Sequence, residues 1–318
     1  MKIGFLFPGQ GSQSVGMGKD LYEKYEEVRE VYKKVQDITG IDVAKISFEG
    51  DEETLNKTQN TQLCILTMSL AILKILKEKG IKAEVSCGLS LGEYSSLIYS
   101  GALSFDEGVK LVQKRGEYMQ KYIPEGEWMM AAFLGITEEQ VNEVCKKANE
   151  QSKENFVVPV NYNCPGQIVV TGNKSGIEAV EEFAKEIGIK RVRILKTSGP
   201  FHTEKLIEAS NALRKDMENI TFNKFETAVI KNIDGTEYKE TDDIKDILAK
   251  HIINPVKFTT SLQKMLDMGV DTFIEIGPGR TLSGFVKRMK GDKEVNILNI
   301  NNCETLETAL KEVIKWVK

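Results

Sequence analysis

Short apolar segments alternate with amphipathic stretches of helical length over most of this 318-residue chain. Each apolar run is followed by a stretch that can form a helix, as in Ile3–Phe7 with Lys19–Val35, Glu84–Cys87 with Leu91–Ser100, Thr272–Ile276 with Thr281–Met289, and Val295–Ile300 with Glu304–Val317. This alternation predicts a parallel β-sheet with helices covering its faces. We therefore expect a large α/β domain.

The middle of the chain has a different rhythm. Its expected order is strand, helix, strand, strand, helix, strand, over Trp128–Leu134, Glu138–Glu150, Val157–Cys164, Gln167–Thr171, Lys174–Ile187 and Arg191–Leu195. This is the order of a ferredoxin-like unit, and Pro165-Gly166 suits the turn of its central hairpin. We expect a small ferredoxin-like subdomain at 126–197, inserted into a larger subdomain of residues 1–125 and 198–318. The cleft between them is the expected site.

Charge and cysteine content exclude several classes of protein. Lys and Arg number 43 against 47 Asp and Glu, and both signs are mixed along the chain, so nucleic acid is not an expected partner. The longest apolar segment, Cys64–Leu76, is shorter than the roughly 20 residues of a membrane span, and the N-terminal apolar run is too short for a signal peptide. Five cysteines without a Cys-x-x-Cys pair favour reduced thiols in the cytoplasm over disulfides or a metal site.

The segment Gly88–Gly92 has the Gly-x-Ser-x-Gly pattern and lies between an expected strand and an expected helix. Such a context is typical of a nucleophile elbow, where the glycines allow a cramped turn that exposes the hydroxyl of Ser90. The helix that follows directs backbone N–H groups at the same point. The alternative is a glycine-rich turn in which Ser90 caps a helix. The elbow interpretation makes the larger subdomain similar to an α/β-hydrolase.

A serine nucleophile needs a base, and the chain has only two histidines, His202 and His251. His202 follows the last strand of the small subdomain, where the chain returns to the larger one, so it is expected to face the cleft. His251 lies before Asn254-Pro255 at a helix end, where an exposed imidazole favoured by the helix dipole is expected. Acidic residues are plentiful, and the sequence does not single out a third member of a catalytic triad.

A second glycine-rich loop, Gly9–Gln13, follows the first expected strand. Its spacing fits neither a Walker loop nor a dinucleotide-binding fingerprint. Two interpretations remain open. The loop is a tight turn, or its backbone N–H near Gln10 joins that of Leu91 in an oxyanion hole for the carbonyl that Ser90 attacks.

These segments occur together with others in an order and at separations typical of one enzyme family. They are Phe7–Gln13, Thr61-Gln62, Gly88–Tyr94, Lys114–Gly116, Asn161–Gln167, Ser198–His202, Asn254–Val256 and Glu275–Gly279. From end to end, the chain resembles the malonyl-CoA:acyl carrier protein transacylases of bacterial type II fatty acid synthesis. The resemblance implies malonyl-CoA and holo acyl carrier protein as partners. We also expect no cofactor, a cytoplasmic location and a monomer.

The resemblance also implies a ping-pong acyl transfer. Ser90 attacks the thioester with His202 as base, and the malonyl-serine passes its acyl group to the phosphopantetheine thiol of the carrier. Gln10 and Leu91 supply the oxyanion-hole N–H groups, and Arg115 matches the arginine that holds the malonyl carboxylate. A planar guanidinium fork suits that carboxylate, which lysine cannot reproduce. Without the resemblance, Arg115 would be interpreted as a surface charge.

Further substrate contacts are implied at Gln62, Asn161, Phe201 and His251. Phe201 and Leu91 are the residues of malonyl-selective members, so malonyl is expected over methylmalonyl. Three positions depart from the family pattern: Leu89 replaces a frequent histidine, Leu63 a usual proline, and His251 a usual glutamine. The glutamine's backbone carbonyl orients the catalytic imidazole in the family, and a backbone carbonyl survives the exchange.

Three alternatives stay open. The first is an acyltransferase of the same fold that serves a polyketide synthase in trans. A serine thioesterase or esterase is the second, and a non-catalytic docking module for carrier proteins is the third. Because acyl carrier proteins are acidic, a basic patch beside the cleft is expected. Its candidates are Lys190, Arg191, Arg193, Lys196, Lys287, Arg288 and Lys290.

Overall fold

The computed structural model describes residues 1–195 and 199–317. Its larger sheet is entirely parallel, with the strand order β7-β2-β1-β8-β9. The strands are β1 (Ile3–Phe7), β2 (Val85–Gly88), β7 (Ala228–Ile230), β8 (Thr272–Ile276) and β9 (Asn296–Ile300). β1 and β8 are buried along their whole length, as expected for central strands covered on both faces.

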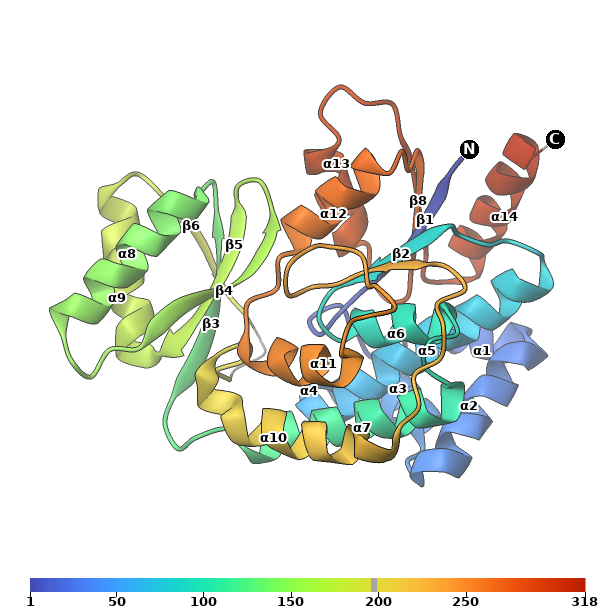
Figure 1. Cartoon of the computed structure of the whole chain (residues 1–318), viewed down its shortest axis with the longest axis horizontal. Coiled ribbons are helices and arrows are strands. Elements are labelled where there is room, and N and C mark those ends of the chain that lie inside the picture. Colours follow the sequence, from blue (N-terminus) through green and yellow to red (C-terminus); the bar gives the residue numbers. More distant parts are fainter. Residues whose placement is uncertain (196–198, 318) are drawn as a thin grey trace.

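Helices surround this sheet (Figure 1). They are α1 (Lys19–Lys24), α2 (Glu26–Thr39), α3 (Val43–Phe48), α4 (Glu52–Asn56), α5 (Thr58–Glu78), α6 (Gly92–Tyr99), α7 (Phe105–Lys121), α10 (Ile207–Asp216), α11 (Ile244–Ile253), α12 (Phe258–Asp267), α13 (Thr281–Met289) and α14 (Cys303–Val317), with 3-10 turns at Glu204–Leu206 and Met217–Asn219. Apart from the buried Arg115 on α7, the charged residues of α2 and α7 lie on their exposed faces, while most of their apolar residues are buried.

Helix α5 is the apolar centre of the larger part. By length and composition it is the single helix among the described residues that could cross a membrane, and 78% of its most apolar window is buried inside the protein. Its neighbours include α2, α3 and α7. Burial on nearly all sides explains why its sequence is apolar without a clear polar face.

The smaller sheet is antiparallel, with the order β4-β5-β3-β6. Its strands are β3 (Trp128–Leu134), β4 (Val157–Cys164), β5 (Gln167–Asn173) and β6 (Arg191–Ile194), and its helices are α8 (Glu138–Gln151) and α9 (Lys174–Glu186). Figure 1 shows both helices on the side of this sheet that faces away from the parallel sheet. They enclose a separate hydrophobic core that includes Phe133, Val144 and Val180.

The small sheet is joined to the larger part by direct contacts. Val256, in the loop after α11, donates its N–H to Val160 O at 2.8 Å, and Tyr162 donates to Val256 O at 2.9 Å. Met130 and Val169 of the small sheet belong to the same apolar cluster as Phe201. The other face of the small sheet therefore packs toward the larger part and forms one wall of a cleft.

The predicted fold class is confirmed: a parallel-sheet α/β part and a separate antiparallel sheet in the ferredoxin-like order are both present. Two details differ from the prediction. The stretch Lys19–Val35 is split into α1 and α2 because Tyr25 is extended, with φ −112° and ψ 127°. The short strand β7 was not predicted. The subdomain boundaries remain a prediction, and the one at 197/198 lies outside the described residues.

Candidate active site

The turn between β2 and α6 places Ser90 at the carboxyl end of the parallel sheet. Ser90 has φ 52°, in the left-handed region that non-glycine residues seldom occupy. A Cβ added at Gly88 would lie 1.9 Å from Gly92 C, and one added at Gly92 would lie 2.1 Å from Phe7 O. Both glycines are therefore required by close backbone contacts, as a nucleophile elbow demands.

His202 lies against this serine. Its Nε2 is 2.8 Å from Ser90 Oγ, and its Nδ1 is 2.8 Å from the backbone carbonyl of His251. Because a carbonyl only accepts, Nδ1 carries the proton and Nε2 is left bare to accept from the serine hydroxyl. This is the tautomer that a general base needs.

The carbonyl that orients His202 comes from the last turn of α11. The last four carbonyls of a helix have no intrahelical partner, and His251 is the third residue from the C-terminal end of α11, which finishes at Ile253. Its oxygen is thus free to accept from an imidazole. A helix end here does the work that a carboxylate does in a Ser-His-Asp triad.

His202 is 4% exposed and also has a positive φ, 61°. Burial, followed by the nearby Arg115 guanidinium, lowers the pKa of His202 from 6.5 to about 4. Both effects disfavour the imidazolium form. The ring is therefore neutral, and able to take a proton, across the whole physiological pH range.

Arg115 projects from α7 to the same point. Its Nη2 donates to Ser90 Oγ at 3.0 Å, and its Nη1 donates to Gln62 Oε1 at 2.6 Å. The side chain is 1% exposed and lies over the ring of Tyr94 at 5.4 Å. A cation held this rigidly beside a nucleophile is suited to bind an anionic group of the substrate.

Gln10 and Leu91 lie on the same cavity as Ser90. Within the described residues, neither of their N–H groups donates to another backbone group. The Gln10 side chain is anchored instead by a bond from Nε2 to Thr58 Oγ1 at 3.2 Å. Both amides remain available to an oxyanion.

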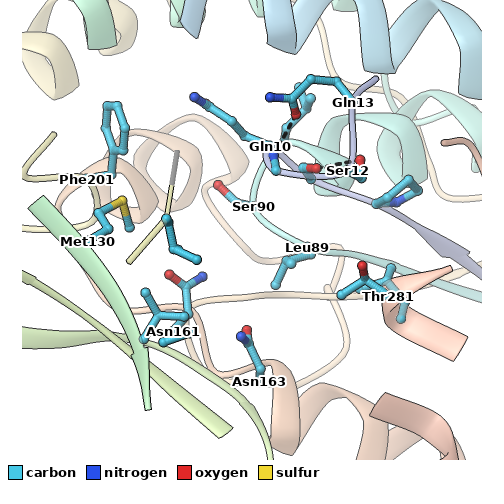
Figure 2. Close-up of a pocket in the computed structure, with 18 of the residues that line it drawn as sticks. Gln10, Ser12, Gln13, Leu89, Ser90, Met130, Asn161, Asn163, Phe201 and Thr281 are labelled. Atoms are coloured by element: carbon cyan, nitrogen blue, oxygen red, sulfur yellow. Dashed lines mark hydrogen bonds between the residues drawn. The ribbon is translucent and has the colours of Figure 1, made fainter. Parts of the chain in front are cut away.

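These groups line a cavity of about 810 Å³ between the two sheets. Figure 2 shows Ser90 near its centre, with Met130 and Phe201 on one side and Asn161 and Asn163 on another. Its wall includes Gln10, Gln62, Ser90, Leu91, Arg115, Asn161, Phe201 and His202. The structure therefore brings together all of the site residues predicted from the sequence except one.

The exception is the His251 side chain, which does not line the cavity. It is 1% exposed, so the expectation of an exposed imidazole at this helix end is wrong. The ring is buried behind His202, with the ring centroids 5.0 Å apart, which confirms that the two histidines are neighbours. Its Nδ1 lies 3.1 Å from Glu93 Oε2. Only the backbone of His251 acts on the site directly.

Sequence reasoning missed a set of polar residues beneath the elbow. Asn232 Oδ1 accepts from Ser90 N–H at 2.7 Å, and Asn232 Nδ2 donates to Gly88 O at 2.6 Å. Tyr238 donates to Glu93 Oε1 at 2.6 Å. The sequence held no usable signal for Asn232, because this residue is placed at the carboxyl edge of the sheet by β7, a strand too short to be predicted.

Only some of the predicted basic residues lie at the cavity. Arg193 and Arg288 line the cavity, while Lys190, Arg191 and Lys287 are exposed and Lys290 is half-buried. Arg288 donates to Gln167 Oε1 at 2.9 Å, which links α13 to the small sheet. Lys196, like Ser198 of the motif before His202, lies outside the described residues.

No group of three or more His, Cys, Asp or Glu that could hold a metal ion occurs among the residues that the structure describes. The site as built provides a serine, a base, two free amides and a fixed cation. This set can perform acyl transfer by nucleophilic catalysis.

Comparisons with known proteins agree with this chemistry. The acyl transferase domain family matches residues 4–311. Malonyl CoA-acyl carrier protein transacylase of Bacillus subtilis (strain 168) is 42% identical over 310 residues, which cover 98% of this chain and 96% of that protein. The crystal structure of malonyl CoA-acyl carrier protein transacylase from Clostridium perfringens is 45% identical, with a TM-score of 0.92 over 99% of this chain and 98% of that one.

A third relative was solved with a partner. It is a malonyl-transacylase in complex with its type II PKS acyl-carrier protein, 34% identical, with a TM-score of 0.92 over 98% of this chain and 100% of that one. This chain thus matches each relative in sequence and in fold over nearly the whole length of both proteins. The chain belongs to the acyl transferase domain family and, within it, to the malonyl CoA-acyl carrier protein transacylases.

Proposed function

We propose that this enzyme transfers the malonyl group from malonyl-CoA to the phosphopantetheine thiol of acyl carrier protein and so supplies fatty acid synthesis. The observation that carries the proposal is the convergence of Ser90, His202 and Arg115, with Ser90 Oγ 2.8 Å from the base and 3.0 Å from the guanidinium. The first contact activates a nucleophile, and the second places a cation where a dicarboxylic acyl group brings its free carboxylate.

In the first half-reaction, Ser90 Oγ attacks the thioester carbonyl while its proton moves to His202 Nε2. The carbonyl oxygen becomes an oxyanion that accepts from the N–H groups of Gln10 and Leu91. Collapse of this intermediate breaks the carbon–sulfur bond. The departing sulfur takes the proton from Nε2, which leaves malonyl-Ser90 and free coenzyme A.

The second half-reaction repeats these steps with a different thiol. The carrier's phosphopantetheine sulfur attacks the malonyl-serine ester and gives its proton to His202 Nε2. The imidazolium then returns the proton to Ser90 Oγ as the ester bond breaks. Because His202 is neutral at the start of each half-reaction, it can act as base in both directions.

Arg115 gives this scheme its selectivity. A guanidinium that is 1% exposed and fixed by Gln62 offers a two-donor fork to the malonyl carboxylate. An acetyl group cannot fill that position, so the cation is left without its anion. Phe201 and Leu91 narrow the space beside the α-carbon, which favours malonyl over methylmalonyl.

Mass spectrometry of the intact protein tests the proposal. The enzyme is mixed with malonyl-, methylmalonyl- or acetyl-CoA, and holo acyl carrier protein is then added. We expect a malonyl adduct on the enzyme that disappears as the carrier gains it. A Ser90→Ala variant should form no adduct, and a malonyl group still found on that variant would refute the assignment of the nucleophile.

A polyketide carrier is the second candidate acceptor, since one relative was solved with a type II PKS acyl-carrier protein. Equal amounts of a fatty acid carrier and a polyketide carrier can be mixed with the malonyl-enzyme. The ratio of malonylated carriers then measures the preference directly. We expect the fatty acid carrier to be favoured.

A thioesterase or esterase would use the same serine and base with water as acceptor. Arg115 argues against it, because a buried cation has no function toward a neutral acyl chain. Release of free malonate faster than transfer to the carrier would support the hydrolase instead.

Three further properties are part of the proposal. The subdomains are residues 1–125 with 198–318, and 126–197. The protein works in the cytoplasm, a location that its five free cysteines support. It acts as a monomer, for which light scattering at working concentration is the measurement.

A further inference from the structure

Glu93 is a buried acid that the transfer scheme does not use. It lies in the first turn of α6, three residues after Ser90, and is 0% exposed. Its Oε1 accepts from Tyr238 at 2.6 Å, and its Oε2 accepts from the Asn232 N–H at 3.4 Å. A carboxyl group without access to water needs such partners to be tolerated.

Two chains of contacts run from this carboxyl to the two reacting side chains. On one side, Asn232 holds the Ser90 N–H and the Gly88 carbonyl, at 2.7 Å and 2.6 Å. These bonds fix the strained turn that presents the hydroxyl. The backbone N–H of the same asparagine binds Glu93, so the carboxyl sets where the asparagine side chain lies.

On the other side, His251 lies between Glu93 and the base. Its Nδ1 is 3.1 Å from Glu93 Oε2, although neither ring nitrogen has an aligned hydrogen bond. Burial, then His202 and Arg115, lower the pKa of the His251 ring well below 6.5, so the ring is neutral and this is a polar contact rather than an ion pair. The backbone carbonyl of the same residue orients His202 Nδ1 at 2.8 Å. By fixing the position of the His251 ring, Glu93 also fixes the position of the His251 backbone carbonyl.

We propose that Glu93 is a positioning residue that fixes the nucleophile and its base relative to each other, through Asn232 toward Ser90 and through His251 toward His202. The inference rests on the proposed function, because it deepens the account of the same site. Glu93 touches neither the cavity nor the reacting atoms. Its effect is to keep two independent backbone segments in register, one after β2 and one at the end of α11.

The charge of the site agrees with this role. Burial raises the pKa of Glu93 to about 7, while Tyr238, Asn232 and Arg115 act to lower it. Donors directed at both oxygens favour the carboxylate form. In its ionised form, Glu93 places one negative charge below the serine, and Arg115 places one positive charge beside it.

A matched control exists in the same part of the molecule, on the parallel sheet. Glu275 on β8 is 1% exposed, and it accepts from Leu282 N–H at 3.1 Å and from Ser283 N–H and Oγ at 2.7 Å each. It is a buried carboxyl with donors on both oxygens, but it contacts neither Asn232 nor His251. Loss of either acid should harm folding, and only loss of Glu93 should disturb the reacting pair.

The experiment compares Glu93→Ala with Glu275→Ala in single-turnover acylation by malonyl-CoA, after the wild type has been measured. We expect acylation to slow about 10- to 100-fold in the Glu93 variant and less than about threefold in the control, at similar losses of Tm. The dissociation constant for malonyl-CoA should stay within about twofold, since the cavity wall is unchanged. Equal rates in the two variants would overturn the inference.

Histidine-selective 15N NMR supplies a readout that a loss of stability does not move. The chain has only two histidines, so every imidazole signal is assignable. We expect Glu93→Ala to shift the His251 nitrogens and to weaken the Nδ1–H signal of His202, and Glu275→Ala to leave both rings unchanged. An unchanged spectrum for the Glu93 variant would refute the link.

If the alanine variants do not fold, Glu93→Gln and Glu275→Gln keep the side-chain shape and carry the same test. The His251 shift and an acylation rate at least about threefold below the control are then expected for Glu93→Gln, and a rate equal to the control would contradict the proposal. Failure of the proposed function is separate, since it would appear as a wild type that takes no malonyl group.

Discussion

The two histidines are the most instructive pair of residues in the molecule. Both are buried, and their rings lie 5.0 Å apart at 33°. His202 belongs to a tight loop at the cavity, whereas His251 belongs to the last turn of a helix and is closed off behind it. One contributes its ring and the other its backbone carbonyl. Access and backbone context, rather than residue type, decide which imidazole can do chemistry.

The sharpest way to break this comparison is to remove each ring in turn. His202→Ala should lower the acylation rate by about 10³-fold or more, because no other base among the described residues contacts Ser90. His251→Gln should change the rate by less than about fivefold, since the carbonyl remains and the glutamine amide can donate to Glu93. Rapid-quench mass spectrometry of the acyl-enzyme measures both. Equal losses would show that acylation needs the His251 ring as well as its carbonyl.

Arg115 sharpens the comparison because it acts on the two histidines differently. It donates to Ser90 beside His202, whereas its only effect on His251 is that its charge lowers the pKa of that ring. Arg115→Ala should lower kcat/KM for malonyl-CoA by about 10²-fold, the scale of a lost charge-assisted pair, and improve the use of acetyl-CoA. Arg115→Lys is the control that keeps the charge without the fork. Steady-state kinetics with both thioesters provide the measurement. Unchanged malonyl transfer would contradict the carboxylate clamp.

The pH dependence of acylation tests the state of His202. Because its pKa is lowered to about 4, the base stays unprotonated as the pH falls through 6 and 5. We expect kcat/KM to hold its plateau to about pH 5 and to fall about tenfold per unit below about pH 4. Circular dichroism at each pH confirms that the fold persists. A midpoint near the ordinary histidine value would mean that the ring is more solvated than the structure indicates.

The smallest expected effect concerns stability and isolates His251. Its pKa is lowered well below 6.5 by burial, then by His202 and Arg115. The unfolded chain therefore binds a proton below pH 6.5 that the native ring refuses, so this residue destabilises the protein as the pH falls. His251→Gln removes this titrating group. As the pH falls from about 7.5 to about 5.5, the unfolding free energy of the variant should therefore decrease by about 1 kcal/mol less than that of the wild type.

Urea unfolding at the two pH values gives this difference. The raised pKa of Glu93 acts in the opposite sense, so both proteins are compared in a Glu93→Gln background, where position 93 does not titrate. Parallel losses in the two proteins would show that His251 is already charged in the native state.

Much of the fold could be predicted because its signals are local. The strands Ile3–Phe7, Thr272–Ile276 and Trp128–Leu134 have the boundaries expected from the apolar pattern. The break at Tyr25 has no proline or glycine to announce it, and tertiary packing decides it. The strand Ala228–Ile230 is too short to show a period, so pairing with β2 alone reveals it.

The part of the site that could be predicted also depends on local sequence signals. The elbow is a local motif that identifies Ser90, and a count of two histidines restricts the base to one of two positions. The polar residues beneath the elbow are not close in sequence, since Glu93 and Tyr238 are separated by 145 positions along the chain. Nothing in the sequence around either residue indicates the other, and only the folded chain brings them together.

Ser90 and His202 share one more property, since they are the only non-glycine residues with positive φ in the described part of the chain. A left-handed conformation costs a side chain on the order of 1 kcal/mol, and glycine escapes this cost. Stability selection and activity selection therefore oppose each other at these two positions. An engineered search for thermostable variants that ignores turnover would drift toward glycine there and return a sturdier, inert protein.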